Sequence, residues 1–288
     1  MNLRAVLVLA VVGCCVWPAV AQTCRFTKLN GSPQGVNKYD TVVGTYTDSS
    51  VERQRGFRWN GGNWTSYNYP QAEATFFNGN NDSGAIVGAY YNQGQANPSH
   101  GFEFYQGTWY AVDAPGAGTT VVNGISKSGV LVGTFTYAGK SHEHGFLKTP
   151  GGWKVLDYPG STWTEANGIN DAGEVVGAYY DGSSVHGFSY YEGAYRRYDV
   201  PNETLTHAYG IDKYGTIVGA TQNGTYYQGD APYFGFTYKG GKFYLLSYPN
   251  ESSSQIFGIN DLGDRVGVMQ TTDAAGNMES FGFLEVCR

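Results

Sequence analysis

The chain has 288 residues, of which 42 are glycine and 24 are tyrosine, while 15% are charged and the formal net charge is −6. A weakly acidic chain without a run of lysine or arginine lacks the positive charge that nucleic-acid phosphates require, which excludes nucleic acid as a partner. Glycine suits turns and tyrosine suits half-buried strands, so the composition predicts an all-β protein.

Residues 1–21 have the pattern of an export signal. Arg4 precedes a nearly unbroken apolar run at 5–17, and the small residues at 19–21 fit a cleavage site. The apolar run is short for a membrane span and no later segment approaches one, so we predict a secreted protein, extracellular or periplasmic, that is not transmembrane. In an alternative interpretation, residues 11–14 form a lipobox and a lipid anchors the protein through Cys14.

Removal of residues 1–21 as a signal peptide leaves a mature chain, 22–288, with two cysteines. Cys24 and Cys287 lie at its two ends. In an oxidising compartment such a pair indicates a disulfide rather than a metal site or a catalytic thiol, and a free reactive pair is the alternative.

A ten-residue unit of the form G-I-N-D-x-G-x-I-V-G recurs six times, at intervals of 42–48 residues. Its copies begin at Gly35, Gly79, Gly124, Gly168, Gly210 and Gly258. Each copy is followed by a Gly-Phe pair, and the first five by an aromatic-rich stretch that ends in proline nine residues before the next copy. Turn signals between short apolar segments predict four strands per repeat, the pattern of a β-propeller blade. A β-solenoid is the main alternative, but its repeats are usually shorter.

We therefore predict a six-bladed β-propeller with four-stranded blades, formed by residues 22–288 as a single domain. Small residues around Ile-Val-Gly suit a crowded centre, so the strands nearest the axis are expected near residues 41–46, 85–90, 130–135, 174–179, 216–221 and 264–269. The last repeat supplies only three strands, and residues 24–29 have the pattern of the fourth. The N-terminal strand is thus expected to close the last blade and to bring Cys24 beside Cys287.

Three His-Gly-Phe triplets begin at His100, His144 and His186. Together with the repeated unit and the Asp-x-Pro stretches, they resemble the HAF-type extracellular repeat proteins of bacteria, over residues 35–283. The sequence departs from that pattern where glycine replaces the middle alanine of His-Ala-Phe, and where Arg55, Phe234 and Phe281 replace the histidine. The resemblance implies export and a propeller, and it carries no catalytic residue across.

Residues that recur at one place in the repeats are expected to be structural. Three aspartates of the repeated unit are predicted to form turns: Asp82, Asp171 and Asp261. Three others, each two residues before a proline, are predicted to make hydrogen bonds at strand ends: Asp113, Asp157 and Asp199. The histidines of the triplets would lie one per blade around the ring, so no metal site is predicted.

Residues that break the repeat are better candidates for a site. The position three residues before a unit holds Phe76, Val121, Glu165, His207 and Gln255. Glu165, His207 and Gln255 would lie on neighbouring blades beside Trp163 and could converge on one face, and a solvated loop face without a ligand is the alternative. A carboxylate with a histidine could do acid–base chemistry, and an indole ring could stack on a sugar.

These patterns, with an aromatic content of 16%, favour an exported, non-enzymatic and monomeric binding protein without a cofactor. Its expected ligand is a carbohydrate or a cell-surface component. The alternatives are a secreted polysaccharide hydrolase or lyase that acts through Glu165 and His207, and a purely structural surface module.

Overall fold

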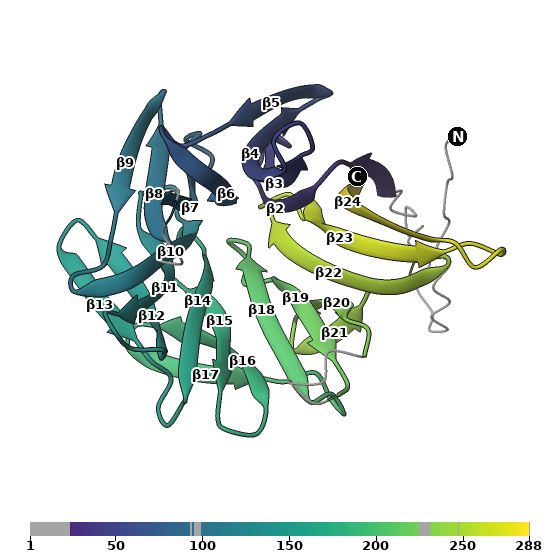
Figure 1. Ribbon diagram of the computed structural model, residues 1–288. Coiled ribbons are helices and arrows are strands. Elements are labelled where there is room, and N and C mark those ends of the chain that lie inside the picture. Colours follow the sequence, from purple (N-terminus) through teal and green to yellow (C-terminus); the bar gives the residue numbers. More distant parts are fainter. Residues whose placement is uncertain (1–23, 93, 95–98, 225–230, 247, 288) are drawn as a thin grey trace.

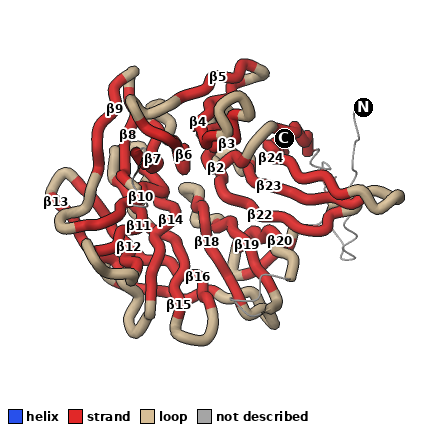
Figure 2. Tube along the Cα trace, viewed as in Figure 1, coloured by secondary structure: helices blue, strands red, loops and turns tan. Residues whose placement is uncertain are grey.

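The computed structural model describes residues 24–92, 94, 99–224, 231–246 and 248–287 (Figure 1). The predicted export signal and Cys14 lie outside the described residues. The part of the chain that is described consists of strands, turns and loops (Figure 2), and no helix in it could span a membrane.

The described residues contain 24 strands, which form four sheets of four strands and one of eight. The first sheet contains β2 (Ser32–Val36), β3 (Val42–Asp48), β4 (Arg53–Asn60) and β5 (Asn63–Tyr67). The second contains β6 (Ala72–Asn80), β7 (Ile86–Asn92), β8 (His100–Tyr105) and β9 (Thr108–Val112). The third contains β10 (Ala117–Ile125), β11 (Leu131–Tyr137), β12 (Glu143–Thr149) and β13 (Gly152–Leu156).

The eight-stranded sheet consists of two four-stranded meanders. One contains β14 (Trp163–Ile169), β15 (Val175–Tyr180), β16 (Val185–Tyr191) and β17 (Ala194–Tyr198). The other contains β18 (Leu205–Ile211), β19 (Ile217–Gln222), β20 (Phe234–Lys239) and β21 (Lys242–Leu245). They are joined by a single parallel pair, Val185 opposite Leu205, so each meander keeps the four-stranded pattern of the other sheets. Four-stranded antiparallel meanders set around a common axis make the fold β-propeller-like (Figure 1).

The last sheet joins the two ends of the described chain. Its order is β1 (Cys24–Leu29), β24 (Met278–Cys287), β23 (Arg265–Thr272) and β22 (Glu251–Ile259). β1 pairs antiparallel with β24, with Cys24 directly opposite Cys287. The two cysteines form a disulfide with their Cα atoms 4.1 Å apart, slightly closer than the usual range of about 4.4–6.8 Å. The predicted disulfide and the closure by the N-terminal strand are confirmed.

The prediction of the strands nearest the axis is wrong. The first strand of each repeat lies innermost, and the Ile-Val-Gly strand is second in each sheet. The reason is the glycine that begins each unit: a methyl group added at Gly124 would lie 2.9 Å from the carbonyl oxygen of Asn167 and 3.3 Å from the Cα of Gly168, in the next repeat. The final glycine of the unit, such as Gly133, is instead crowded within its own sheet, by the carbonyl oxygen of Val121.

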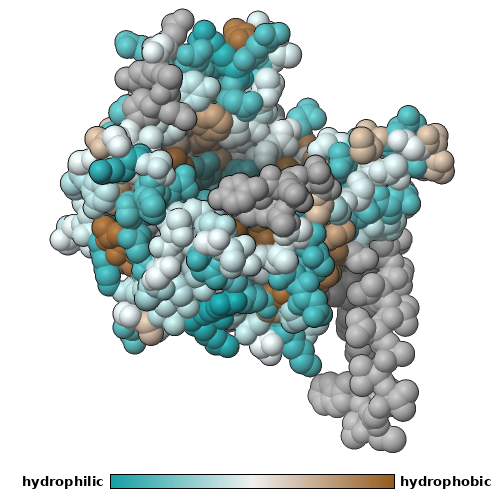
Figure 3. Space-filling view, turned by 60° about the horizontal axis from the view of Figure 1, so that its bottom comes forward, coloured by the Kyte–Doolittle hydropathy of each residue, from teal (hydrophilic) through white to brown (hydrophobic). Residues whose placement is uncertain are grey.

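The core lies between the sheets. The phenylalanine of each Gly-Phe pair is at most 1% exposed: Phe57, Phe102, Phe146, Phe188, Phe236 and Phe283. Hydrophobic clusters around these rings include residues of neighbouring repeats, as in the cluster that joins Val87 to Phe146. Because one buried aromatic ring recurs per repeat, each sheet packs against the next in the same way. The face seen in Figure 3 is hydrophilic or intermediate in hydropathy, with scattered hydrophobic side chains.

Candidate functional site

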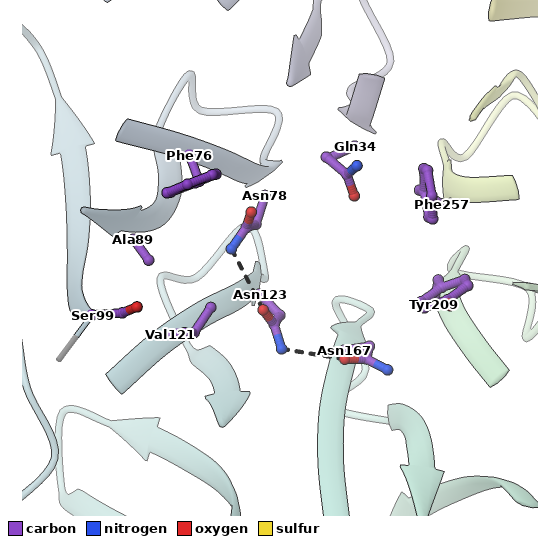
Figure 4. Close-up of a pocket in the computed structure, with 10 residues that line it drawn as sticks. All are labelled: Gln34, Phe76, Asn78, Ala89, Ser99, Val121, Asn123, Asn167, Tyr209 and Phe257. Carbon is purple, nitrogen blue, oxygen red and sulfur yellow. Dashed lines mark hydrogen bonds between the residues drawn. The ribbon is translucent and has the colours of Figure 1, made fainter. Parts of the chain in front are cut away.

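A cavity of about 400 Å³ opens on the axis, at the end where the first strands begin. We call it the axial cavity. Each of the six first strands contributes to its wall the residue that precedes the glycine of its unit (Figure 4): Gln34, Asn78, Asn123, Asn167, Tyr209 and Phe257. Phe76, Ala89, Ser99 and Val121 also line it.

The six wall residues share one backbone feature, which is a β-bulge. In each first strand the pairing register shifts across the residue that precedes the glycine of the unit, as between Ala166 and Gly168 or between Ala208 and Gly210. A bulge leaves its extra residue out of the ladder and redirects the side chain. The bulge therefore frees Asn167, Tyr209 and their counterparts from sheet pairing, so that their side chains line the cavity.

One half of the wall is made of amides. The side-chain amide of Asn78 donates to the carbonyl oxygen of Val122 at 3.1 Å, and that of Asn167 donates to the carbonyl oxygen of Ala208 at 3.1 Å. Asn123 lies between them, and its side-chain amide donates a hydrogen bond of 3.2 Å to the side-chain oxygen of Asn167 (Figure 4). These bonds cross from each repeat to the next, so they hold a polar surface in a fixed orientation.

Two aromatic residues, Tyr209 and Phe257, adjoin each other on another part of the wall. The rings of Tyr209 and Phe257 lie edge to face, with centroids 5.2 Å apart. The ring of His207, on the same strand as Tyr209, is nearly parallel to it at 5.5 Å. Trp163 continues the row, since its ring lies 6.0 Å from that of His207 at an interplanar angle of 14°. A row of ring contacts thus leads from Phe257 and Tyr209 in the cavity wall to His207 and Trp163.

Three of the four residues predicted for the site come together. His207 Nε2 lies 3.6 Å from the carboxylate of Glu165, which is too long for a hydrogen bond and close enough for an ion pair when the imidazole is protonated. The side chain of His207 is buried, and its Nδ1 has no hydrogen-bond partner among the described residues. Trp163 packs over the same imidazole. This carboxylate, imidazole and indole form one cluster beside the axial cavity.

Gln255 occupies the corresponding position on β22, opposite Val268. Within the described chain no hydrogen bond joins it to Glu165 or His207. The structure therefore does not add Gln255 to the cluster.

Glu143 is a titratable residue that interacts electrostatically with Glu165 and that the sequence did not indicate. It begins β12, after the loop that leaves β11, outside the repeated unit. Partial burial of its carboxyl, together with the negative charge of Glu165, raises the pKa of Glu143 above its usual value. The two carboxylates thus belong to one electrostatic group, although they come from neighbouring repeats.

The opposite end of the axis, which we call the turn mouth, is closed by the turns that follow the first strands. A small cavity of about 80 Å³ remains there. Asn170 closes its turn: its side-chain oxygen accepts from the backbone N–H groups of Ala172 and Glu174 at 3.1 and 3.0 Å, and its amide donates to the carbonyl oxygen of Asp212 in the next repeat. Asn37, Asn81 and Asn260 do the same in their own repeats.

The prediction that the aspartates form these turns is therefore corrected. The asparagine before each aspartate closes the turn, whereas the aspartate accepts a backbone N–H from a lysine of the preceding repeat. The pairs are Asp82 with Lys38 at 3.0 Å, Asp171 with Lys127 at 2.7 Å, and Asp261 with Lys213 at 2.9 Å. Lysine occurs at this position in the first, third and fifth repeats and aspartate in the others, so these bonds couple the repeats two by two.

The histidines of the three triplets each bond a carboxylate of their own repeat. The pairs are His100 with Asp113 at 3.1 Å, His144 with Asp157 at 2.9 Å, and His186 with Asp199 at 2.9 Å. The predicted role of these aspartates in hydrogen bonds at strand ends is confirmed. His186 has a second partner, Asp181 at 3.1 Å, and the N–H groups of Ser183 and Ser184 help to hold the pKa of Asp181 well below its usual value.

No protein-family model and no curated protein matches the sequence. Among solved structures, a protein of unknown function from Dyadobacter fermentans has a similar fold, with a TM-score of 0.56 and 10% identity over 92% of this chain and 99% of that chain. A fucose-specific lectin from Aleuria aurantia gives a TM-score of 0.49 and 12% identity, over 88% of this chain and 92% of that chain. At 10% identity the likeness to the Dyadobacter fermentans protein concerns the fold alone.

Proposed function

We propose that the protein is an exported β-propeller that binds a carbohydrate, free or on a cell surface, in the axial cavity without turning it over. The observation that carries this proposal is the divided wall, with Asn78, Asn123 and Asn167 on one side and Tyr209 and Phe257 on the other. A sugar ring has hydroxyl groups that amides can bond, and apolar faces that pack on aromatic rings. The volume of about 400 Å³ lies within the range of small-molecule sites.

The architecture that we propose is a closed ring of six blades, in which the eight-stranded sheet counts as two. The contacts of the first glycines support it. A methyl group on Gly210 would lie 3.3 Å from the Cα of Gly258, and one on Gly258 would lie 3.3 Å from the Cα of Gly35. The first strand of the last repeat, β22, therefore packs against the first strand of the first repeat, β2. The disulfide agrees with export to an oxidising compartment, and we retain a relationship to the HAF-type repeat proteins as part of the proposal.

The test is a glycan array followed by calorimetry on the best saccharide. Tyr209→Ala removes one aromatic ring from the cavity wall, and we expect it to weaken binding at least tenfold. Tyr214→Ala is the matched control, because Tyr214 lies on a turn at the other end of the axis and is 72% exposed. Equal affinity in the wild type and Tyr209→Ala would contradict the proposal. Silence on the array and in turnover assays would favour a structural surface module.

A polysaccharide hydrolase or lyase is the second candidate. It is favoured by the carboxyl pair, since the raised pKa of Glu143 suits a proton donor, while Glu165 beside His207 suits a base. Saccharide release by the wild type that disappears in Glu165→Gln, with binding retained, would establish this function in place of simple binding.

A further inference from the structure

Two sheets have a pair of stacked tyrosines, one just before the first strand of the sheet and one on its second strand. Tyr69 packs on Tyr90 with centroids 3.6 Å apart and an interplanar angle of 7°, and Tyr158 packs on Tyr179 at 3.7 Å and 4°. In each pair the first tyrosine comes directly before the proline of the repeat. A third ring lies edge-on to that tyrosine, Trp109 at 5.2 Å in one repeat and Tyr195 at 5.3 Å in the other.

The sheet that comes between these two in the sequence, β10–β13, has the same arrangement except that the first tyrosine ring is missing. Ala114 stands where the others have tyrosine, and its backbone N–H donates to the hydroxyl oxygen of Thr120 at 3.0 Å. The equivalent bonds of Tyr69 and Tyr158 are 2.9 and 3.0 Å, so the backbone follows the same path. Phe135 takes the place of the second tyrosine.

The aromatic surroundings of the missing ring are also present. Trp153 takes the place of Trp109, and its ring lies 4.9 Å from that of Phe146. A cavity of about 150 Å³ opens here, which we call the alanine slot. It is lined by Ala114, Pro115, Phe135, Tyr137, Phe146, Trp153, Lys154 and Val155. An engineered apolar cavity of about 150 Å³ in another protein binds benzene, so a slot of this size suits one six-membered aromatic ring.

We propose that the alanine slot is a binding site for a small phenol. The bound ring takes the place that the tyrosine ring fills in the two neighbouring repeats, against Phe135 and with its edge toward Trp153. Tyr137, which is 41% exposed and lies edge-on to Phe135 at 5.0 Å, forms the rim. Lys154 also lines the slot; its ammonium group donates to the hydroxyl of Tyr190 and has further hydrogens to donate to a phenolic oxygen. This site is independent of the axial cavity and of the function proposed for it.

The first experiment titrates the full chain with 4-methylphenol, which is the tyrosine side chain as a free molecule, and follows binding by saturation-transfer NMR and calorimetry. Cyclohexanol is the non-aromatic control. We expect saturable binding of one phenol per chain, with at least tenfold weaker binding of cyclohexanol. Ala114→Tyr fills the slot with the chain's own ring, so phenol binding should fall at least tenfold while the circular dichroism spectrum is unchanged. Undiminished phenol binding by a folded Ala114→Tyr would overturn the proposal.

A second variant decides the matter if Ala114→Tyr does not fold. Tyr158→Ala removes the ring that fills the equivalent place in the next repeat, and it should create a second slot. The number of phenol molecules bound per chain should then rise from one to two. A number that stays at one in folded Tyr158→Ala would show that an absent tyrosine does not make a phenol site.

Discussion

The two ends of the axis are built from the same six strands and differ in how uniform they are. At the turn mouth an asparagine closes the turn in four repeats, and Ser126 and Asp212 accept the same type of backbone hydrogen bond in the other two. At the axial cavity the bulged residue is glutamine, asparagine, tyrosine or phenylalanine. Every turn must satisfy the same backbone groups, whereas a bulged side chain is released from pairing. The difference indicates that the turn mouth serves the fold, and that the axial cavity is where the repeats are free to differ.

The largest expected effect concerns the disulfide that joins β1 to β24 in the last sheet. The turn mouth has a bond across the closing seam, from the side-chain amide of Asn260 to the carbonyl oxygen of Asn37 at 3.0 Å. Replacing Cys24 and Cys287 with serine should lower the free energy of unfolding by about 2–5 kcal/mol, because the disulfide closes a very long loop. Urea titration measures this loss, and hydrogen exchange should rise first in β1 and β24. Unchanged exchange there would mean that the disulfide is incidental to closure.

The next effect compares asparagines at the two ends. Asn170→Ala leaves several buried backbone groups at the turn mouth unpaired, so we expect a loss of about 2–4 kcal/mol in the free energy of unfolding. Asn167→Ala removes a half-buried amide at the axial cavity and should cost about 1 kcal/mol. Chemical denaturation of both variants measures the difference. Equal losses of unfolding free energy would show that the asparagines at the two ends of the axis contribute equally to stability.

A third prediction concerns charge at the site. Glu165→Gln keeps the shape of the side chain and removes its charge beside His207, so we expect about tenfold weaker saccharide binding, or about 1.4 kcal/mol. The free energy of unfolding should change by less than about 0.5 kcal/mol. Glu174→Gln removes a charge from a turn at the other end and is the matched control. If both variants weaken binding equally, the effect comes from net charge and not from the site.

The smallest effect is a pH dependence of stability caused by Glu143. The pKa of Glu143 is raised in the folded state above its ordinary value of 4.5, so the folded protein holds this proton at pH values where the unfolded chain has lost it. The stability contribution of Glu143 is therefore greatest at low pH and declines as pH rises from about its ordinary pKa through the raised value. Glu143→Gln should remove this slope, as seen by comparing melting temperatures from pH 4 to pH 7. An unchanged slope would show that the pKa of Glu143 is not raised in the folded protein.

The fold was predictable from the sequence where one residue type recurs in each repeat or where a pair is covalent. The unit beginning at Gly124 and its copies indicated the four-stranded repeats, and Cys24 with Cys287 indicated the closure. The innermost strand was not predictable from small size alone, because Gly124 and Gly133 are both crowded and only the structure shows that Gly124 meets the next repeat. A glycine in the sequence indicates that its surroundings are crowded, and it does not indicate whether the crowding comes from its own sheet or from the next repeat.

The site was predictable only in part. Comparing repeats led to Glu165 and His207, and the two-residue period of a strand would have led on to Asn167 and Tyr209, which lie two positions further along. The bulge at those positions leaves no mark in the hydrophobic alternation. Glu143 follows a loop that varies between repeats, so no comparison of equivalent positions could reveal it.

The disulfide also determines how the protein responds to mechanical force. Cys24 and Cys287 are 263 positions apart in sequence and are joined by one covalent bond. When the two ends of the chain are pulled, tension passes through that bond, and the residues between the cysteines lie outside the load path. The propeller should therefore stay folded under stretching until the disulfide is reduced. Once it is reduced, β1 and β24 are the first strands to carry the load.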